Sequence, residues 1–205
     1  MYSAKTFALF ISILIWLASC TNEESRQKPA AENTLPDSVI AAEGRKAAMR
    51  LGKSLQSHLK TQFQENGALG AVQYCEQRAI SLTRQAEEQK RFNVSLKRTS
   101  LNYRNPENQP DSLESEVLKQ LKNEHHRGEM PKYHIYRDKS GKKQVYHYFQ
   151  PITMKKLCLN CHGNPGQMDE DLKVFLNRAY PQDRATGYEE GDFRGVIHVS
   201  LVDAK

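Results

Sequence analysis

A five-residue motif near the C-terminal end, Cys158-Leu159-Asn160-Cys161-His162, constrains this chain more than any other feature. Two thiols three positions apart, followed at once by an imidazole, form the C-x-x-C-H pattern of c-type haem attachment. In that chemistry each thiol adds to one vinyl group of the porphyrin, and the short loop holds the histidine beneath the iron. The pattern predicts one haem c, with Cys158 and Cys161 as thioether residues and His162 as an axial ligand.

Two other interpretations of these thiols stay open. A structural zinc site needs four ligands, commonly supplied by a second pair of closely spaced Cys or His residues. The sequence has no second Cys-x-x-Cys, and His125 and His126 are adjacent rather than three to five apart. A thioredoxin-like dithiol requires a strand before the motif and a helix after it, whereas turn-forming residues 163–166 follow here. A zinc- or dithiol-containing binding module without haem is therefore the alternative.

The N-terminal segment has the features of an exported lipoprotein. Lys5 is followed by an apolar run over residues 6–17, which is too short to span a bilayer and is typical of a secretory signal peptide. Leu17-Ala18-Ser19-Cys20 resembles the bacterial lipobox, which predicts cleavage before Cys20 and lipid modification of its sulfur. An ordinary signal peptide or an uncleaved anchor is the alternative.

The remaining composition predicts a tether followed by one domain. Residues 21 to about 37 are polar, charged and proline-containing, as flexible tethers are. We expect a lipoprotein signal peptide over residues 1–19, a lipid-anchored flexible tether over 20–38 and a haem-binding domain over 39–205, the size of one ordinary domain.

The predicted anchor places the protein in the bacterial cell envelope, on the periplasmic side, with the membrane as a partner. Thr21 after the lipidated cysteine favours the outer membrane where the organism has one. The net charge is +6, but the basic residues are spread along the chain with acidic residues between them. Such charge is typical of a solvated surface, so we expect no nucleic-acid partner.

Hydrophobic periodicity predicts helices first and strands afterwards. Asn66-Gly67 separates two helical patterns, and Asp111 with Glu114 forms a capping box at the start of a third. Two alternating segments predict a β-hairpin, whose polar residues His134 and His147 we expect to face solvent. The order of elements predicts an α+β fold with an antiparallel sheet and long N-terminal helices. The predicted helices cover residues 39–65, 68–88, 111–126 and 169–179, and the strands cover 93–98, 133–137, 144–149 and 194–201.

Cys75 is the thiol that remains once Cys20 is lipidated and the two motif cysteines bind haem. It lies on the apolar face of the second predicted helix, where a single cysteine is commonly a small core residue. A six-coordinate iron needs a second axial ligand, and spacing leaves that choice open. Met154 and Met168 lie too close to the motif in sequence to reach the opposite haem face with ease. The other candidates are Met49, Met130, His58, His125, His126, His134, His147 and His198.

Four segments, dispersed in order over most of residues 39–201, together carry a family resemblance. They are Ala71-Val72-Gln73-Tyr74-Cys75, residues 98–101 with 104–108, residues 158–163, and Gly187-Tyr188 through residues 191–195. In combination they resemble the exported, single-haem c-type cytochromes with a PAS-like fold, long catalogued as a domain of unknown function. The resemblance implies a PAS-like antiparallel sheet flanked by helices. It also implies that His162 and Cys75 are the two iron ligands, and that the protein acts in sensing or electron transfer.

Arg98, Tyr103 and Arg104 lie in a polar loop that includes one of these segments. Guanidinium groups pair bidentately with carboxylates, so we expect these residues to contact the haem propionates. The alternative is a loop held by its own hydrogen bonds.

These expectations favour electron transfer or redox and gas sensing over catalysis. A thiolate ligand favours ferric iron and lowers the potential relative to a Met/His cytochrome. Loosening of Cys75 on reduction would open a site for a small gas ligand, while electron transfer requires a redox partner protein. We expect no enzyme, because two protein ligands close the iron; a haem enzyme of peroxidase type is the alternative.

Overall fold

The computed structural model of the chain describes residues 34–87, 91–139, 141 and 143–203. The predicted signal peptide, Cys20 and the tether up to residue 33 lie outside the described residues. Residues 34–205 form one compact unit. Its helices are α1 (Asp37–Gln85), α2 (Ser112–His126), α3 (Leu159–His162) and α4 (Glu170–Ala179), and its strands are β1 (Phe92–Thr99), β2 (His134–Asp138), β3 (Val145–Thr153) and β4 (Phe193–Asp203).

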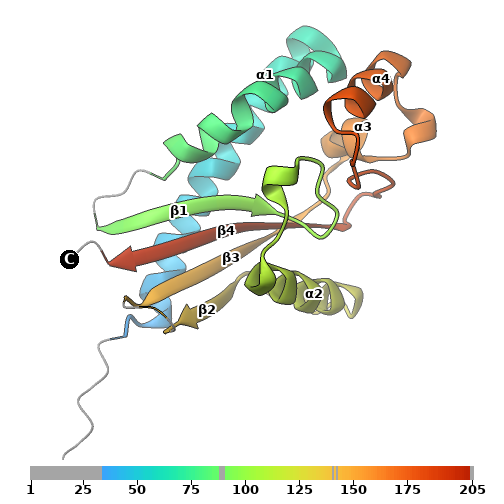
Figure 1. The fold of residues 1–205 in the computed structure, drawn as a ribbon. Helices are drawn as coiled ribbons and strands as arrows, with labels where there is room; N and C mark the ends of the chain where they lie inside the picture. The colour runs from blue at the N-terminus through green and yellow to red at the C-terminus, as the bar shows by residue number, and fades with distance from the viewer. Residues whose placement is uncertain (1–33, 88–90, 140, 142, 204–205) are drawn as a thin grey trace, which may run out of the picture. The chain divides into compact units, whose positions relative to one another are not determined.

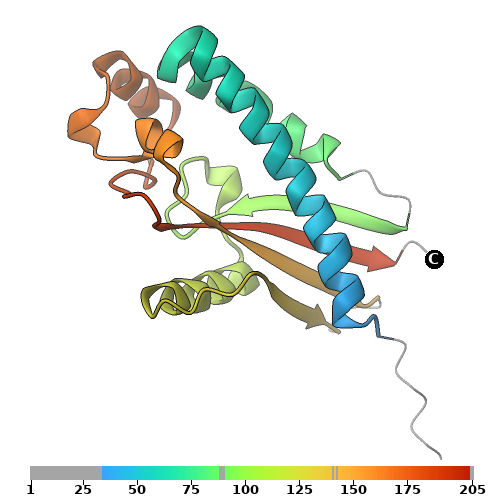
Figure 2. The same cartoon turned by 180° about the vertical axis from the view of Figure 1, so that it is seen from behind.

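Helix α1 is interrupted at Gly67, whose φ of 66° and ψ of −169° are not helical. Glycine adopts a positive φ at little cost because it has no Cβ. The two segments of α1 fold back along each other (Figures 1 and 2), and Arg50 donates its Nε to the carbonyl oxygen of Ala86 at 2.9 Å. The predicted break at Gly67 is confirmed, and the second segment ends at Gln85 rather than near residue 88.

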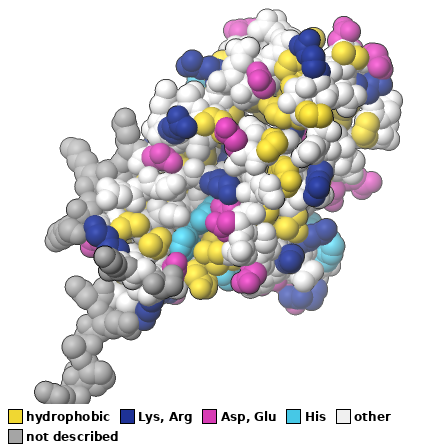
Figure 3. Space-filling view, in the orientation of Figure 1, with side chains coloured by type: hydrophobic (Ala, Val, Ile, Leu, Met, Phe, Trp, Pro, Cys, Tyr) yellow, Lys and Arg dark blue, Asp and Glu magenta, His cyan; other side chains and the backbone are white. Residues whose placement is uncertain are grey.

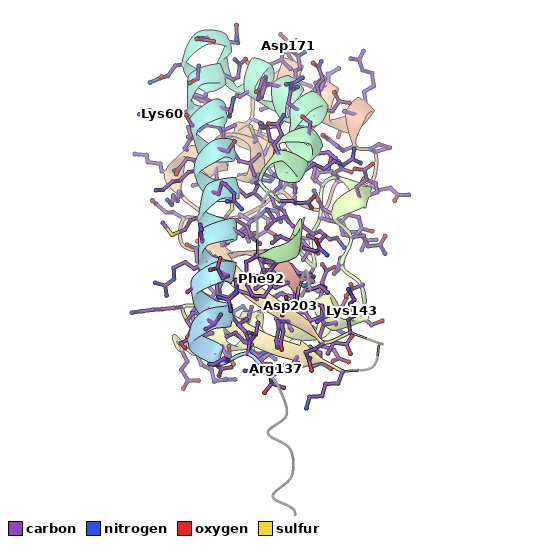
Figure 4. All side chains as sticks on the ribbon, turned by 90° about the vertical axis from the view of Figure 1, so that its left-hand side faces the viewer. Lys60, Phe92, Arg137, Lys143, Asp171 and Asp203 are labelled. Atoms are coloured by element: carbon purple, nitrogen blue, oxygen red, sulfur yellow. The ribbon has the colours of Figure 1, made fainter. Side chains whose placement is uncertain are left out.

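The four strands form one antiparallel sheet in the order β1-β4-β3-β2. Strand β4 lies next to β1, pairing Phe92 with Asp203 at one end and Thr99 with Val196 at the other. Figure 4 labels Phe92 and Asp203 side by side. Strands β2 and β3 form the predicted hairpin. Strand β4 therefore lies between β1 and β3, two strands that are far apart in the sequence.

Helices cover both faces of this sheet, as Figures 1 and 2 show. Because side chains alternate along a strand, the central strands β3 and β4 contribute to two cores, one on each face of the sheet. The core under α1 includes Ile40, Leu51, Phe92, Tyr148 and Val199, and the core under α2 is Val117, Leu118, Leu121, Phe149 and Val196. The predicted α+β, PAS-like architecture with a long N-terminal helical region is confirmed.

Helix α1 packs closely against the sheet at Gly44. A Cβ there would lie 2.3 Å from Cγ of the Tyr148 ring on β3. We expect Gly44→Ala to lower the free energy of unfolding by about 1–3 kcal/mol, because a fully buried ring must be displaced. Gly52→Ala on the same helix is the control, since its Cβ would meet only Ile197 Cδ1 at 3.8 Å. Alanine there should stabilise by up to about 1 kcal/mol through helix propensity, and urea unfolding of the two variants should therefore shift in opposite directions.

The prediction that His147 faces solvent is wrong. Its Nδ1 lies 2.8 Å from Nε2 of His198 on β4, and the Nδ1 of His198 lies 2.7 Å from Oε1 of Glu114 on α2. Glu114 also accepts a hydrogen bond from Nζ of Lys97 at 2.7 Å and completes the predicted capping box with Asp111. The β3–β4 pairing places these two histidines next to each other under α2. Strand alternation alone does not predict this position.

Charged side chains of both signs are mixed on the surface. On the face in Figure 3, Lys and Arg are interspersed with Asp and Glu, as the sequence predicts. Within the described ranges, none of the helices has the length and apolar character needed to cross a bilayer.

Candidate functional site

The Cys-x-x-Cys-His motif forms a short helical loop at one end of the sheet. Residues 156–158 form a 3-10 turn, α3 follows directly, and Gly163 ends it by donating its N–H to the carbonyl oxygen of Leu159 at 2.8 Å. A Cβ at Gly163 would lie 2.6 Å from that oxygen, so a glycine is required here. Cys158 and Cys161 are half-buried free thiols. Both thiols therefore lie in one compact loop, and neither is in a disulfide.

His162 is oriented by a backbone acceptor on another segment. Its Nδ1 lies 2.6 Å from the carbonyl oxygen of Ala185, so Nδ1 carries the hydrogen and donates it. That bond leaves Nε2 as the lone-pair atom, the arrangement found for histidines that ligate metals. Burial lowers the pKa of His162 well below its usual range, and the nearby charges of Arg104 and Arg194 act in the same direction. The imidazole is thus held neutral and fixed in one tautomer.

Arg104 connects the motif to the segment that holds His162. Its side chain is 10% exposed, and its Nε donates to Oδ2 of Asp183 at 2.8 Å. Its Nη2 donates to the carbonyl oxygen of Cys161, and lies 3.4 Å from that of Ala185. Asp183 in turn accepts a hydrogen bond from the N–H of Ala185 at 2.7 Å. One guanidinium therefore joins the loop after β1, the motif and residues 183–185.

The second segment of α1 carries Cys75 to the same end of the molecule. Val72, one turn before Cys75, packs with Leu172 and Leu176 of α4 in a cluster that Cys161 also contacts. Figure 1 shows this segment of α1 gathered with α3 and α4. The side chain of Cys75 is half-buried and also lines a cavity of about 10 Å³ between the two segments of α1.

The charges at the site link Cys75 to the motif. Burial raises the pKa of the Cys75 thiol, and the positive charges of Arg98 and Arg104 oppose that rise. Burial also raises the pKa of the Cys161 thiol to about 11, with Arg104 lowering it and Cys75 raising it further. The structure therefore brings Cys75, Arg98, Arg104 and the motif into one electrostatic environment.

The three residues predicted to contact propionates differ in their contacts with other protein groups. Arg104 is engaged by the protein groups described above, whereas the buried Nε of Arg98 has no hydrogen-bond partner. Burial lowers the pKa of Arg98, and the nearby Cys75 raises it. Tyr103 stacks its ring under the Arg184 guanidinium at 5.5 Å, and its carbonyl oxygen accepts from the N–H of Arg184 at 3.2 Å. Arg98 therefore retains a donor for an added carboxylate.

The other candidate axial ligands are dispersed. His147 and His198 belong to the Glu114 network under α2, and Met130 packs with the α2 core. Met168 packs with the cluster that includes Cys161, and His58 lines the small cavity beside Cys75. Among the described residues, no group of three or more His, Cys, Asp or Glu side chains is arranged to hold a metal ion.

The sequence alone did not identify the residues of another segment that hydrogen-bond to the motif and contact His162. Gly187 and Tyr188 donate their N–H groups to the carbonyl oxygens of Gly163 and His162 at 2.8 and 3.0 Å. The ring of Tyr188 lies edge-on to that of His162, with 6.5 Å between the centroids. Gly187-Tyr188 appears in the family resemblance without a role, whereas Ala185 carries no sequence signal because it acts through its backbone carbonyl.

The comparisons with known proteins agree with this architecture. The model of the Tll0287-like family matches residues 30–201. No curated protein matches the chain at a significant level. The crystal structure of the cyanobacterial heme-protein Tll0287 superposes with a TM-score of 0.60 and 23% sequence identity, over 84% of this chain and 98% of that one. That likeness shows a shared fold. Because the family model matches most of the sequence, the chain belongs to the Tll0287-like family.

Proposed function

We propose that this protein binds one haem c and acts in electron transfer or in redox or gas sensing. Cys158 and Cys161 would form the thioether bonds, and His162 and Cys75 would be the two iron ligands. Membership of a family that includes a heme-protein supports the cofactor. When bound, haem supplies a one-electron couple whose potential depends on the axial ligands.

The observation that carries this proposal is the hydrogen bond from His162 Nδ1 to the Ala185 carbonyl oxygen. It fixes the tautomer whose Nε2 can bind iron, directly after two free thiols at the spacing of haem attachment. The buried, unpartnered Nε of Arg98 adds a donor suited to a propionate. The donor set of the site therefore fits a covalently attached, carboxylate-bearing porphyrin.

Cys75 is suited to act as an iron ligand that can bind and be released. Because burial raises the pKa of its thiol, the uncoordinated side chain stays protonated and neutral. A bound iron would hold the sulfur as a thiolate, a form that the charges of Arg98 and Arg104 also favour. The balance between these two forms is the property that a redox or gas sensor requires. A Cys75 that stays bound in both oxidation states would favour simple electron transfer.

The first test is expression in a host competent for cytochrome maturation. We expect each chain to gain the mass of one haem, and the colour to stay with the protein through acid-acetone extraction. Replacing both Cys158 and Cys161 by alanine should abolish that covalent attachment. A wild-type chain that matures without any added haem would overturn the proposed function.

The second test concerns Cys75. Cys75→Ser should change the low-spin ferric signal in electron paramagnetic resonance and raise the reduction potential, because a thiolate stabilises ferric iron. Ala79→Ser is the matched control, since it introduces the same hydroxyl one turn further along the same helix face. If Cys75→Ser and wild type give the same signal, the sulfur ligand is wrong while the haem attachment stands.

We further propose that a lipid on Cys20 anchors the protein to the periplasmic side of a bacterial membrane, where it meets a redox partner protein. The apolar run before Cys20 and the lipobox-like residues support this. Detergent phase partitioning of wild type and Cys20→Ala tests it. The variant should move from the detergent phase to the aqueous phase.

A further inference from the structure

A groove of about 260 Å³ lies between the C-terminal end of α2 and the segment that leads into β4. Figure 1 shows these two parts of the chain on the same side of the molecule. Neither Cys75 nor any residue of the motif lines the groove, but it adjoins the site described above through Gly187, Tyr188 and Arg194. Its lining comes from residues 100–102 after β1, from Lys122, His125 and His126 on α2, and from residues 186–188 and 192–194.

Two permanent positive charges line this groove. Lys122 is exposed on α2 and makes no ion pair within the described part of the chain. The Arg194 guanidinium donates from Nη1 to the carbonyl oxygen of Asn102 at 3.1 Å. Burial lowers the pKa of Arg194 and repulsion from Arg104 acts in the same direction, whereas Tyr188 and Asp183 raise it. The carboxylate in the lining, Asp192, already accepts the N–H of Glu189 at 2.7 Å.

Apolar surface lies beside these charges. Leu101, Tyr188 and Phe193 are among the residues that line the groove, and the Arg194 guanidinium lies 5.5 Å from the Tyr188 ring centroid. The volume is just below the range of about 300–1,000 Å³ that is typical of small-molecule sites. A groove of this size that combines cations with aromatic residues suits a small ligand with a carboxylate group and an apolar or aromatic body.

We propose that this groove binds a small organic carboxylate between Lys122 and Arg194, and that its occupation is transmitted to His162 through Tyr188. Tyr188 connects the two places, since it is one of the residues that line the groove and its ring lies edge-on to that of His162. Its N–H also donates to the His162 carbonyl oxygen. This transmission rests on the proposed function, because it treats His162 as a haem ligand. Binding of a carboxylate in the groove does not depend on the proposed function.

The test uses the haem-loaded protein with benzoate as the probe and benzamide as its neutral counterpart of similar shape. Calorimetry should give saturable benzoate binding, with benzamide at least about tenfold weaker because it lacks the charge. Lys122→Gln should weaken benzoate about tenfold, and Arg194→Gln should weaken it at least as much. Lys119→Gln is the matched control, as Lys119 is exposed on the same helix and does not line the groove. The exposed position of Lys122 keeps the test valid if the Arg194 variant does not fold.

The outcomes separate the site from its transmission. Benzoate binding that weakens in Lys122→Gln and is unchanged in Lys119→Gln supports the site. No binding, or equal binding of benzamide, overturns it. Benzoate should also shift the haem absorption spectrum in wild type, and a bound probe that leaves the spectrum unchanged overturns the transmission through Tyr188. A chain that carries no haem overturns the proposed function, while calorimetry with benzoate still decides on the groove.

Discussion

Substituting Arg104 by methionine should lower the free energy of unfolding by about 3–5 kcal/mol, the cost typical of removing one partner from a buried ion pair. The Asp183 side chain is 11% exposed and would keep its charge without the cation. The carbonyl oxygen of Cys161 would also lose a donor, as would that of Ala185. Urea unfolding of the haem-free chain measures the effect.

The same variant should reduce the fraction of chains that mature with haem. Arg104 bonds the carbonyl oxygen of Cys161 and steadies Ala185, whose carbonyl orients His162. Arg104→Lys should recover only part of both properties, because an ammonium cannot reproduce the planar fork of donors. The loss of stability and the loss of haem attachment should therefore both be larger in Arg104→Met than in Arg104→Lys.

Arg127→Met is the control for Arg104. Arg127 pairs with Glu129 at 2.7 Å, but both side chains are more than half exposed. Solvent screens such a pair, so we expect the urea midpoint of this variant to match wild type. Equal midpoints for the Arg104 and Arg127 variants would show that Arg104 does not hold the motif in place.

Glu114→Gln should destabilise the protein by roughly 3 kcal/mol at neutral pH. Burial alone would raise the pKa of Glu114, but hydrogen bonds from His198 and Lys97 outweigh it and lower the pKa from 4.5 to about 2. Each unit of pKa shift is equivalent to about 1.4 kcal/mol of preference for the charged form in the folded state. Glutamine has nearly the same shape but cannot carry the charge that these donors stabilise.

The pH dependence has a defined sign. Because the folded-state pKa of Glu114 is depressed, its contribution is complete above about pH 4.5 and is lost as the pH falls towards 2. Burial, with the neighbouring His198, also lowers the pKa of His147, so the unfolded chain takes up a proton there before the folded chain does. That second effect reduces stability below about pH 6.5. Both groups therefore act in the same direction and destabilise the protein in acid.

Thermal unfolding between pH 7 and pH 3 measures this prediction. Wild type should lose stability steadily on acidification, and Glu114→Gln should start lower and lose less between pH 4.5 and 3. Glu116→Gln on the same helix is the control, because Glu116 is exposed and we expect wild-type behaviour. A Glu114 variant that keeps the wild-type pH profile would mean that the carboxylate is not the charged centre of this network.

The elements that sequence reasoning recovered are those specified by residues close together in the chain. The break in α1 follows from Gly67, whose positive φ suits a glycine, and the start of α2 follows from the capping box of Asp111 and Glu114. The hairpin of β2 and β3 follows from alternation around a turn. Each of these signals acts over a few residues, so no knowledge of the packed molecule is needed to detect it.

The motif thiols, the histidine that follows them and the unpaired Cys75 are likewise readable from spacing and cysteine arithmetic alone. Tertiary structure decided what surrounds them. Arg104 meets Asp183 across 79 positions of sequence, and His162 is held by the carbonyl of Ala185. Every residue has such a carbonyl, so only the packed chain selects which one serves. His147, expected in solvent, lies beside His198 because β3 pairs with β4 beneath α2, and that pairing joins residues too distant for any local pattern to connect.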